Sequence, residues 1–384
     1  MSTSGGIWSR YFIQIMLANA LAYLGMQMIN TTVVPYAIWL GTAASLAGIL
    51  SGVSFICALL ARPVSGLCTN HMDKRRLLLV SIVLVLLGSV GLSCTTALPL
   101  ILFTRALQGV GYAFVSTLCM AIVADFLPPD RIGKGIGYFG LSICIAQMAG
   151  PALGLWLTAQ IGYPAAYLVT SVFFVVGFLC AYFLPPMPAE TKLPFNLPLL
   201  SPGNLIATES LLPATVGLLF SILNSCLSAF LAVYASSKGI DSAGTFFVVS
   251  ASAMFLSRLL GANTADRRSL AFTGAVSGTL LITSMLLLGF GFNLWTMLAA
   301  AAVFGIGYGF LLPVTQSRSV SAPPPEKHGT GSSTYFIGID LGFSIGNVAG
   351  GFLVQHVGPA NMYLCLIVPA VAAMILCLTK GHDR

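Results

Sequence analysis

The sequence has 384 residues, of which 57% are hydrophobic and 7% are charged, against about 25% charged residues in a soluble domain. Water is therefore not the main solvent of this chain, and the composition excludes a soluble globular protein. The net charge of +7 does not indicate a nucleic-acid partner, because almost all basic residues lie at the ends of apolar segments or in the connections between them.

Apolar stretches long enough to cross a membrane recur along the whole chain. A hydrocarbon core of about 30 Å needs about 20 helical residues. Twelve such stretches are predicted, six in each half: 11–34, 42–65, 77–96, 99–123, 135–157, 164–184, 211–236, 242–262, 269–291, 295–316, 331–355 and 361–379. The pattern predicts an all-α polytopic protein in a lipid bilayer.

The second half of the chain repeats the first at an offset of 196 residues. Six glycine pairs coincide at this offset, where chance would give roughly one or two: Gly109 and Gly305, Gly111 and Gly307, Gly133 and Gly329, Gly135 and Gly331, Gly150 and Gly346, Gly154 and Gly350. Tyr112 likewise recurs as Tyr308. The duplication predicts two pseudo-symmetric six-helix bundles related by an axis along the membrane normal.

Basic residues indicate the orientation in the membrane. In a twelve-span arrangement fifteen of the seventeen lie on one side, Lys238 lies on the other and Arg105 lies inside a span. Positive charge accumulates on the cytoplasmic side. We therefore expect a multi-pass protein of the cytoplasmic (inner) membrane with both termini in the cytoplasm.

A proline-rich connection separates the two halves. It contains Pro185, Pro186, Pro188, Pro194, Pro198 and Pro202, too many for a continuous helix. The predicted division is an N-terminal bundle (1–186), a cytoplasmic linker (187–210) and a C-terminal bundle (211–384).

Cysteines and histidines show no ligand spacing. The nine cysteines are scattered without a C-x-x-C pair, and the four histidines lie in loops or tails. We expect no disulfide, metal site or cofactor.

The connection after the second span, from Arg62 to Arg76, resembles the signature G-x-x-x-D-R-x-G-R-R of the major facilitator superfamily. Gly66, Lys74 and Arg75 stand in register, whereas Asn70 replaces the usual acid. The second half keeps an acid and bases as Asp266, Arg267 and Arg268. Alternatively, these charges serve only to orient the protein.

Two further elements carry the same resemblance inside spans. Residues 105–111 resemble the R-x-x-Q-G-x-G element of the superfamily, and Gly150, Pro151 and Gly154 resemble the G-P-x-x-G element of its proton-driven exporters. Proline removes a backbone donor and bends its helix, while the glycines allow close helix packing. This seam serves either gating or packing alone.

The fourth span carries a polar stripe formed by Arg105, Gln108 and Tyr112 (the α4 stripe). A cation at the bilayer centre costs about 3 kcal/mol or more, so Arg105 needs water or a partner. We expect the stripe to line a cavity; the alternative is a structural anchor. The first span carries no acid, unlike many related exporters, but offers Gln27 among its amides.

The eleventh span carries a matching stripe formed by Asp340, Ser344 and Asn347 (the α11 stripe). Asp340 is the one acid well inside a span. Because a carboxylate inside a bundle can take up and release a proton, Asp340 is the first candidate for proton coupling. The alternative is a structural acid near the end of its helix.

Two polar groups complete the set of candidates. Asp125 ends the fourth span, where the family resemblance implies an ionic latch with the basic residues around Arg75. In the seventh span Asn224 shares a face with Ser221 and Ser228 and is a candidate for hydrogen bonding to substrate, although such serines often bond their own backbone.

These features together predict a monomeric secondary active transporter that exports a small organic molecule by proton antiport with alternating access. The sparse embedded charge favours a lipophilic or weakly charged solute. Export of a metal-chelating metabolite, proton-coupled import of a nutrient and a non-transporting membrane receptor stay open. No clustered catalytic set is visible in the sequence, so we do not expect an enzyme.

Overall fold

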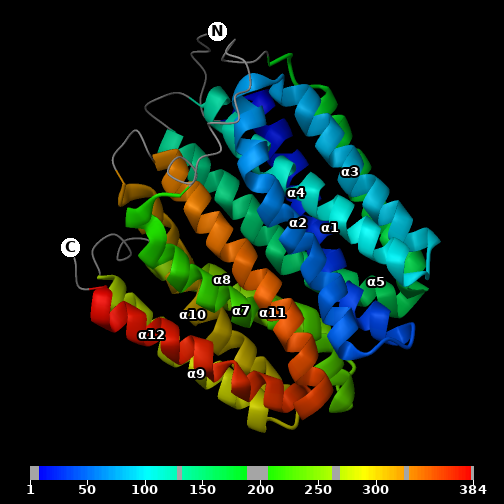
Figure 1. Ribbon diagram of the computed structural model, residues 1–384, viewed down its shortest axis with the longest axis vertical. Helices are drawn as coiled ribbons and strands as arrows, with labels where there is room; N and C mark the ends of the chain where they lie inside the picture. The colour runs from blue at the N-terminus through cyan, green and yellow to red at the C-terminus, as the bar shows by residue number, and fades with distance from the viewer. Residues whose placement is uncertain (1–7, 128–131, 188–205, 262–268, 324–327, 382–384) are drawn as a thin grey trace. The chain divides into compact units, whose positions relative to one another are not determined.

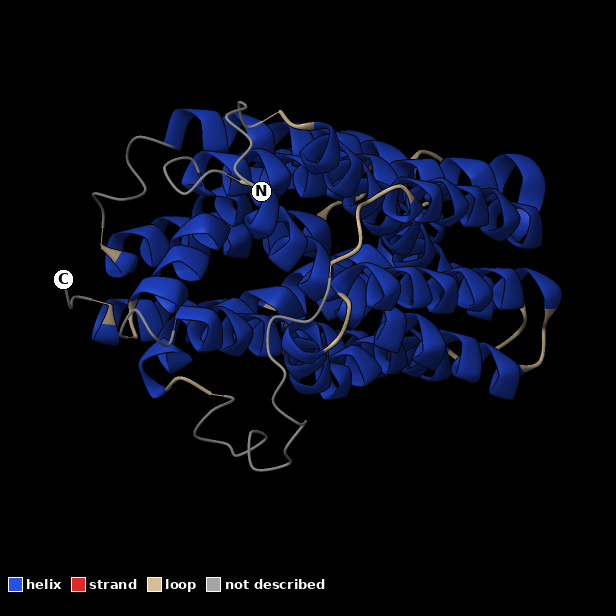
Figure 2. Ribbon diagram, turned by 90° about the horizontal axis from the view of Figure 1, so that it is seen from above, coloured by secondary structure: helices blue, strands red, loops and turns tan. Residues whose placement is uncertain are grey.

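The computed structural model describes residues 8–127, 132–187, 206–261, 269–323 and 328–381. These ranges contain helices and loops and no strand (Figure 2). The helices, labelled as in Figure 1, are α1 (Arg10–Trp39), α2 (Ala44–His71), α3 (Lys74–Cys94), α4 (Leu98–Phe126), α5 (Ile132–Tyr182), α7 (Leu211–Ser237), α8 (Ala243–Gly261), α9 (Leu270–Phe290), α10 (Leu294–Ser321), α11 (His328–Cys365) and α12 (Ile367–Lys380). A short 3₁₀ helix (Thr208–Ser210) precedes α7.

The twelve predicted spans are all present as helices. Ten stretches of the described residues are long and apolar enough to cross a membrane; one of them, 330–380, contains two helices, and a shorter apolar helix covers Ala243–Ser257. Both long helices break at a glycine with positive φ: α5 at Gly162 (78°) and α11 at Gly358 (83°). Only glycine adopts such a φ without strain. The two breaks are 196 residues apart, so the duplication extends to the backbone conformation.

The chain forms two compact units. Unit 1 comprises residues 1–29 and 57–197, and unit 2 comprises residues 30–56 and 198–384. The border between them runs through the middle of α1 and α2. The end of α1 and the start of α2, within residues 30–56, group with the second half of the sequence. The division at the proline-rich linker stays a prediction, because residues 188–205 lie outside the described ranges.

Short polar side chains cap the starts of several helices. Asp73 accepts a hydrogen bond from the backbone N–H of Arg76 (2.9 Å) and so caps α3. Asn293 and Thr296 form a capping box at the start of α10. Each cap satisfies backbone donors that have no partner within the helix, which allows connections of only a few residues between spans.

In unit 1, glycines set the distance between helices. A Cβ on Gly150 would lie 2.6 Å from the Cβ of Gln27, and one on Gly154 would lie 2.9 Å from the carbonyl oxygen of Met28. The G-P-x-x-G element therefore packs α5 directly against α1. Gly111 of α4 lies equally close to α3, where a Cβ would be 2.8 Å from the carbonyl oxygen of Ser81.

In unit 2, four glycines spaced four residues apart form a ladder on α11 that packs against α7: Gly338, Gly342, Gly346 and Gly350. A Cβ at Gly338 would lie 2.6 Å from the carbonyl oxygen of Ala214, and one at Gly350 would lie 2.9 Å from Sγ of Cys226. Small residues at this spacing let two helix backbones approach closely. The same positions in the first copy are Ser142, Ala146, Gly150 and Gly154, so both copies use a face of small residues.

Candidate functional site

The first two residues of the α4 stripe are fully buried. Arg105 and Gln108 are both 0% exposed, and Nη1 of Arg105 donates a hydrogen bond to Oε1 of Gln108 (2.7 Å). Because Arg105 is a pure donor, this bond fixes which way the Gln108 amide points. Gly88 of α3 makes room for the pair, since a Cβ there would overlap Cγ of Gln108. In this conformation Arg105 and Gln108 belong to the packed interior of unit 1.

Tyr112, the third residue of the stripe, lies in a half-buried cluster with residues of two other helices. Its ring lies 5.7 Å from that of Tyr23 on α1, at an angle of 57°. Nε2 of Gln147 on α5 donates a hydrogen bond to Oη of Tyr23 (3.1 Å). We call Tyr23, Tyr112 and Gln147 the tyrosine cluster. All three side chains are partly exposed and sit near the middle of their helices.

Arg62, predicted at the end of a span, lies four residues before the end of the apolar stretch Ala44–Gly66, and α2 continues beyond it to His71. Its Nη1 donates a hydrogen bond to Oγ of Ser116 on α4 (3.3 Å). Ser116 in turn donates to the carbonyl oxygen of Ala113 (3.1 Å). Pro63 lies within α2, although proline disfavours helix at the preceding residue. Three polar residues at 62, 65 and 69, on one face, are the signal that sequence reasoning missed.

The same face of α2 has a second contact with α4. Oγ of Ser65 and Oγ1 of Thr117 lie 3.1 Å apart, and Ser65 also donates to the carbonyl oxygen of Arg62 (2.8 Å). This part of α2 is thereby held in register on α4. The backbone that carries the Arg62 guanidinium is fixed within unit 1.

The α11 stripe is buried in unit 2. Asp340 is 3% exposed and Asn347 is 2% exposed. Oγ of Ser344 donates to the backbone carbonyl oxygen of Asp340 (2.8 Å), so this serine bonds its own helix. Further along the same face Gly351 meets α2, where a Cβ on it would lie 3.0 Å from Cα of Gly48.

Tyr308, the counterpart of Tyr112 in the second copy, contacts α7. Nδ2 of Asn224 donates a hydrogen bond to its Oη (3.3 Å), and the ring of Phe304 stacks on it at 5.5 Å. The counterparts of Arg105 and Gln108 are Ala301 and Phe304. The two copies therefore share the tyrosine, whereas the cation of the α4 stripe occurs in the first copy alone.

An ion pair joins Asp125 to Lys74, one of the basic residues around Arg75. Nζ of Lys74 lies 2.8 Å from Oδ2 of Asp125, with the lysine side chain 5% and the aspartate side chain 33% exposed. Arg75 instead donates to the carbonyl oxygen of Tyr182 and lies over its ring, 5.3 Å from the centroid. Lys74 begins α3 and points along the helix toward α4, while the next residue is rotated by about 100°.

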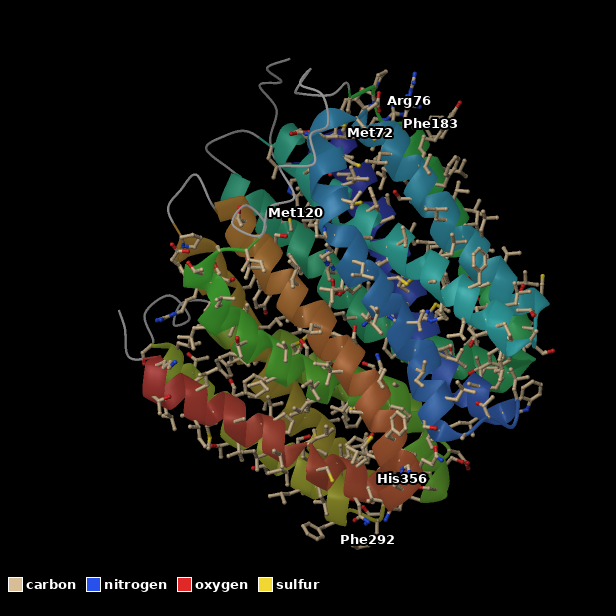
Figure 3. The ribbon with its side chains drawn as sticks, viewed as in Figure 1. Met72, Arg76, Met120, Phe183, Phe292 and His356 are labelled. Atoms are coloured by element: carbon tan, nitrogen blue, oxygen red, sulfur yellow. The ribbon has the colours of Figure 1, made fainter. Side chains whose placement is uncertain are left out.

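Of the other signature residues, Gly66 lies in the described part of the chain. A Cβ on Gly66 would meet nothing within 4 Å. The side chain of Asn70 and the whole of Asp266 and Arg267 lie outside the described parts of the chain. Met72, Arg76 and Phe183 are together at this end of unit 1 (Figure 3).

Replacing Asp125 by Asn is expected to lower the thermal stability of the purified protein. The change leaves the nearly buried ammonium of Lys74 without its carboxylate, which costs about 2 kcal/mol after allowance for the exposed side of the pair. Thermal unfolding in detergent measures the effect. Arg76→Gln, an exposed charge at the same helix end, is the matched control, and the double variant Lys74→Met with Asp125→Leu should recover most of the loss. Equal melting of Asp125→Asn and the wild type would show that the pair adds no stability.

Comparison with known proteins gives one consistent result. The model of the Major Facilitator Superfamily matches residues 15–291 and 266–383. An uncharacterized MFS-type transporter of Burkholderia mallei (strain SAVP1) is 24% identical over 345 residues, covering 88% of this chain and 83% of the relative. The uncharacterized MFS-type transporter YhhS of Escherichia coli (strain K12) is 21% identical, covering 88% and 84%.

Solved structures show the same fold at low sequence identity. A POT family transporter in complex with 5-aminolevulinic acid has a TM-score of 0.80 at 14% identity, covering 97% of this chain and 95% of that one. The human organic anion transporter MFSD10 has a TM-score of 0.72 at 18% identity, covering 96% and 98%. With its apolar helices, its duplicated architecture and these matches, the chain belongs to the major facilitator superfamily and is a multi-pass membrane transporter rather than an enzyme.

Proposed function

We propose that this transporter exports a small organic molecule from the cytoplasm in exchange for protons, by alternating access. The proposal takes the protein as a monomer of two six-helix bundles (1–186 and 211–384) in the inner membrane, with both termini in the cytoplasm. One observation carries it: a single face of α11 bears both the buried carboxylate of Asp340 and the contact with α2. The carboxylate proposed to bind the proton and the contact proposed to open and close are therefore on the same helix, α11.

Residues 44–56 of α2 pack closely against α11, mainly at glycine positions. A Cβ on Gly48 would overlap the carbonyl oxygen of Asn347, and one on Gly52 would lie 2.9 Å from Cγ2 of Val348. The rings of Phe55 and Phe343 stack at 4.7 Å. Because the glycines let the two backbones meet directly, few side chains have to be withdrawn when the helices part, so this contact suits a gate that opens once per cycle.

Protonation of Asp340 would bias that gate. Uptake of a proton removes one negative charge from the face of α11 that continues toward Asn347 and Gly351, and release restores the charge. Any difference in proton affinity between the closed and open contact makes the conformational equilibrium depend on the proton gradient. Export follows if release of the solute and uptake of the proton occur on the same, outer side.

The direction and the coupling can be measured together. Everted membrane vesicles that contain the protein are given an imposed pH gradient, and candidate solutes are screened for their ability to collapse it. We expect at least one lipophilic or weakly charged solute to collapse the gradient and to accumulate inside the everted vesicles. Accumulation in right-side-out vesicles driven by an inward proton gradient would favour import. Counterflow in proteoliposomes separates transport from binding without translocation, as expected for a receptor.

A further inference from the structure

The tyrosine cluster and Arg62 meet the same face of α4 at consecutive turns. Tyr112 belongs to the cluster, and Ser116, which accepts the hydrogen bond of Arg62, follows four residues later. Residues four apart lie on one side of a helix, about 6 Å apart along its axis. Met120, labelled in Figure 3, marks the next turn. Two phenols, an amide and a guanidinium therefore form a continuous polar file within unit 1.

This file is half-exposed within a membrane-spanning bundle. Tyr23, Tyr112, Gln147, Ser116 and Arg62 all keep part of their surface accessible. Gln147 lies near the middle of the apolar stretch Tyr138–Ile161, where an amide that faces acyl chains is costly, so the accessible side of the file faces water or a solute. By contrast, the Arg105–Gln108 pair is fully buried, which makes it a poorer candidate for contact with solute in this conformation.

The chemistry of the file selects one class of ligand. A guanidinium offers a planar fork of donors that binds a carboxylate with two parallel hydrogen bonds. The ring faces of Tyr23 and Tyr112 favour an aromatic or other planar apolar group, and Gln147 supplies both a donor and an acceptor beside them. A solute that reaches both ends carries a carboxylate and a ring, and their contacts on α4, at Ser116 and Tyr112, are about one helical turn apart.

We infer that unit 1 binds an aromatic organic anion, with its carboxylate on Arg62 and its ring against Tyr23 and Tyr112. The inference rests on the proposed function, because it assigns the solute class of the same transport pathway. It narrows the weakly charged solute expected from composition to a monoanion. It also places the binding of the anionic solute in unit 1, apart from the proton binding proposed for Asp340 in unit 2.

Binding of a matched probe series to the purified protein in detergent tests this inference. The probes are N-acetyl-L-tryptophan, its uncharged amide and the ring-free N-acetyl-L-leucine, measured by calorimetric titration at pH 7. We expect the wild type to bind N-acetyl-L-tryptophan at least about tenfold more tightly than either of the other probes, the ratio expected for one charge-assisted hydrogen bond or one buried ring. Equal binding of the acid and the amide, or no binding of the acid, would overturn the inference.

Variants connect the preference to the named residues. Arg62→Gln should reduce the affinity for the acid to that for the amide, while Arg62→Lys, which keeps the charge and the fold, should retain part of the preference. Tyr112→Leu should weaken both indole probes alike. Arg76→Gln, an exposed cation at the end of unit 1, should leave all three affinities unchanged. A preference that persists in Arg62→Gln would assign the anion to another residue. Since binding in detergent needs no translocation, its failure is distinguishable from failure of the transport measurements.

Discussion

Replacing Asp340 by Asn is expected to reduce uptake driven by a pH gradient to the level of vesicles that lack the protein, while the protein stays folded. The side chain is 3% exposed, and Asn has nearly the same volume, so the packing of α11 is preserved. The amide neither takes up nor releases a proton in the physiological range, and the step that couples protons to the α2–α11 contact is therefore lost. Everted vesicles loaded by an imposed gradient, with the solute that performs best in the screen, provide the measurement.

Counterflow distinguishes loss of coupling from loss of transport. Exchange of labelled for unlabelled solute needs no net proton movement, so the Asp340→Asn variant should retain it. Asp241→Asn, which removes an exposed carboxylate from the connection between α7 and α8, is the matched control and should behave as the wild type in both assays. Undiminished gradient-driven uptake by Asp340→Asn would assign proton coupling to a different group.

Replacing Gly48 by Leu is expected to lower transport in both assays by roughly a hundredfold. A Cβ at this position overlaps the carbonyl oxygen of Asn347 and lies 3.0 Å from Cα of Gly351. Both are backbone atoms that cannot rotate away, so closure of α2 on α11 costs about 3 kcal/mol, equivalent to about a hundredfold change in the population of the closed contact. A transporter that seldom closes this contact cannot complete the cycle.

The accessibility of a cysteine placed at the α2–α11 contact shows whether that contact has opened. The backbone N–H of Ser45 bonds Oε1 of Gln355 across the contact (3.3 Å), so a cysteine at position 45, in a background without native cysteines, should react faster with an impermeant maleimide when Gly48 is Leu. Gly140→Leu is the matched control, because a Cβ at Gly140 meets nothing within 4 Å. Normal counterflow by Gly48→Leu would exclude the α2–α11 contact from the cycle.

The positions of the helices could be predicted because hydrophobic length and glycine spacing are local properties. Twelve apolar stretches and one offset were enough to predict twelve helices, and the breaks at Gly162 and Gly358 repeat that offset. The position of each polar residue along its helix followed as well, since the rise is 1.5 Å per residue once the ends are known. Arg105 was therefore correctly placed inside α4, although its burial against Gln108 was not foreseen.

Partners across helices were predicted less well, because each depends on how two helices are rotated against each other. The resemblance did not specify which of the basic residues around Arg75 meets Asp125, and the structure pairs it with Lys74. The contact of Arg62 with Ser116 was not predicted. The glycine at position 88 of α3 decides that Gln108 is enclosed. Such contacts join residues twenty or more positions apart, and periodicity within one helix contains no information about them.

The sequence by itself therefore determined the class of the molecule: a duplicated, twelve-helix membrane protein, with its polar groups at given positions along the helices. The tertiary structure alone decided which of these groups meet, closing Arg105 on Gln108, bringing Tyr23, Tyr112 and Gln147 together and joining α2 to α11 through Gly48 and Gly351. The physical reason is that insertion into a membrane depends on the apolar content of each helix separately, whereas the pairing of side chains depends on the close packing of several helices at once.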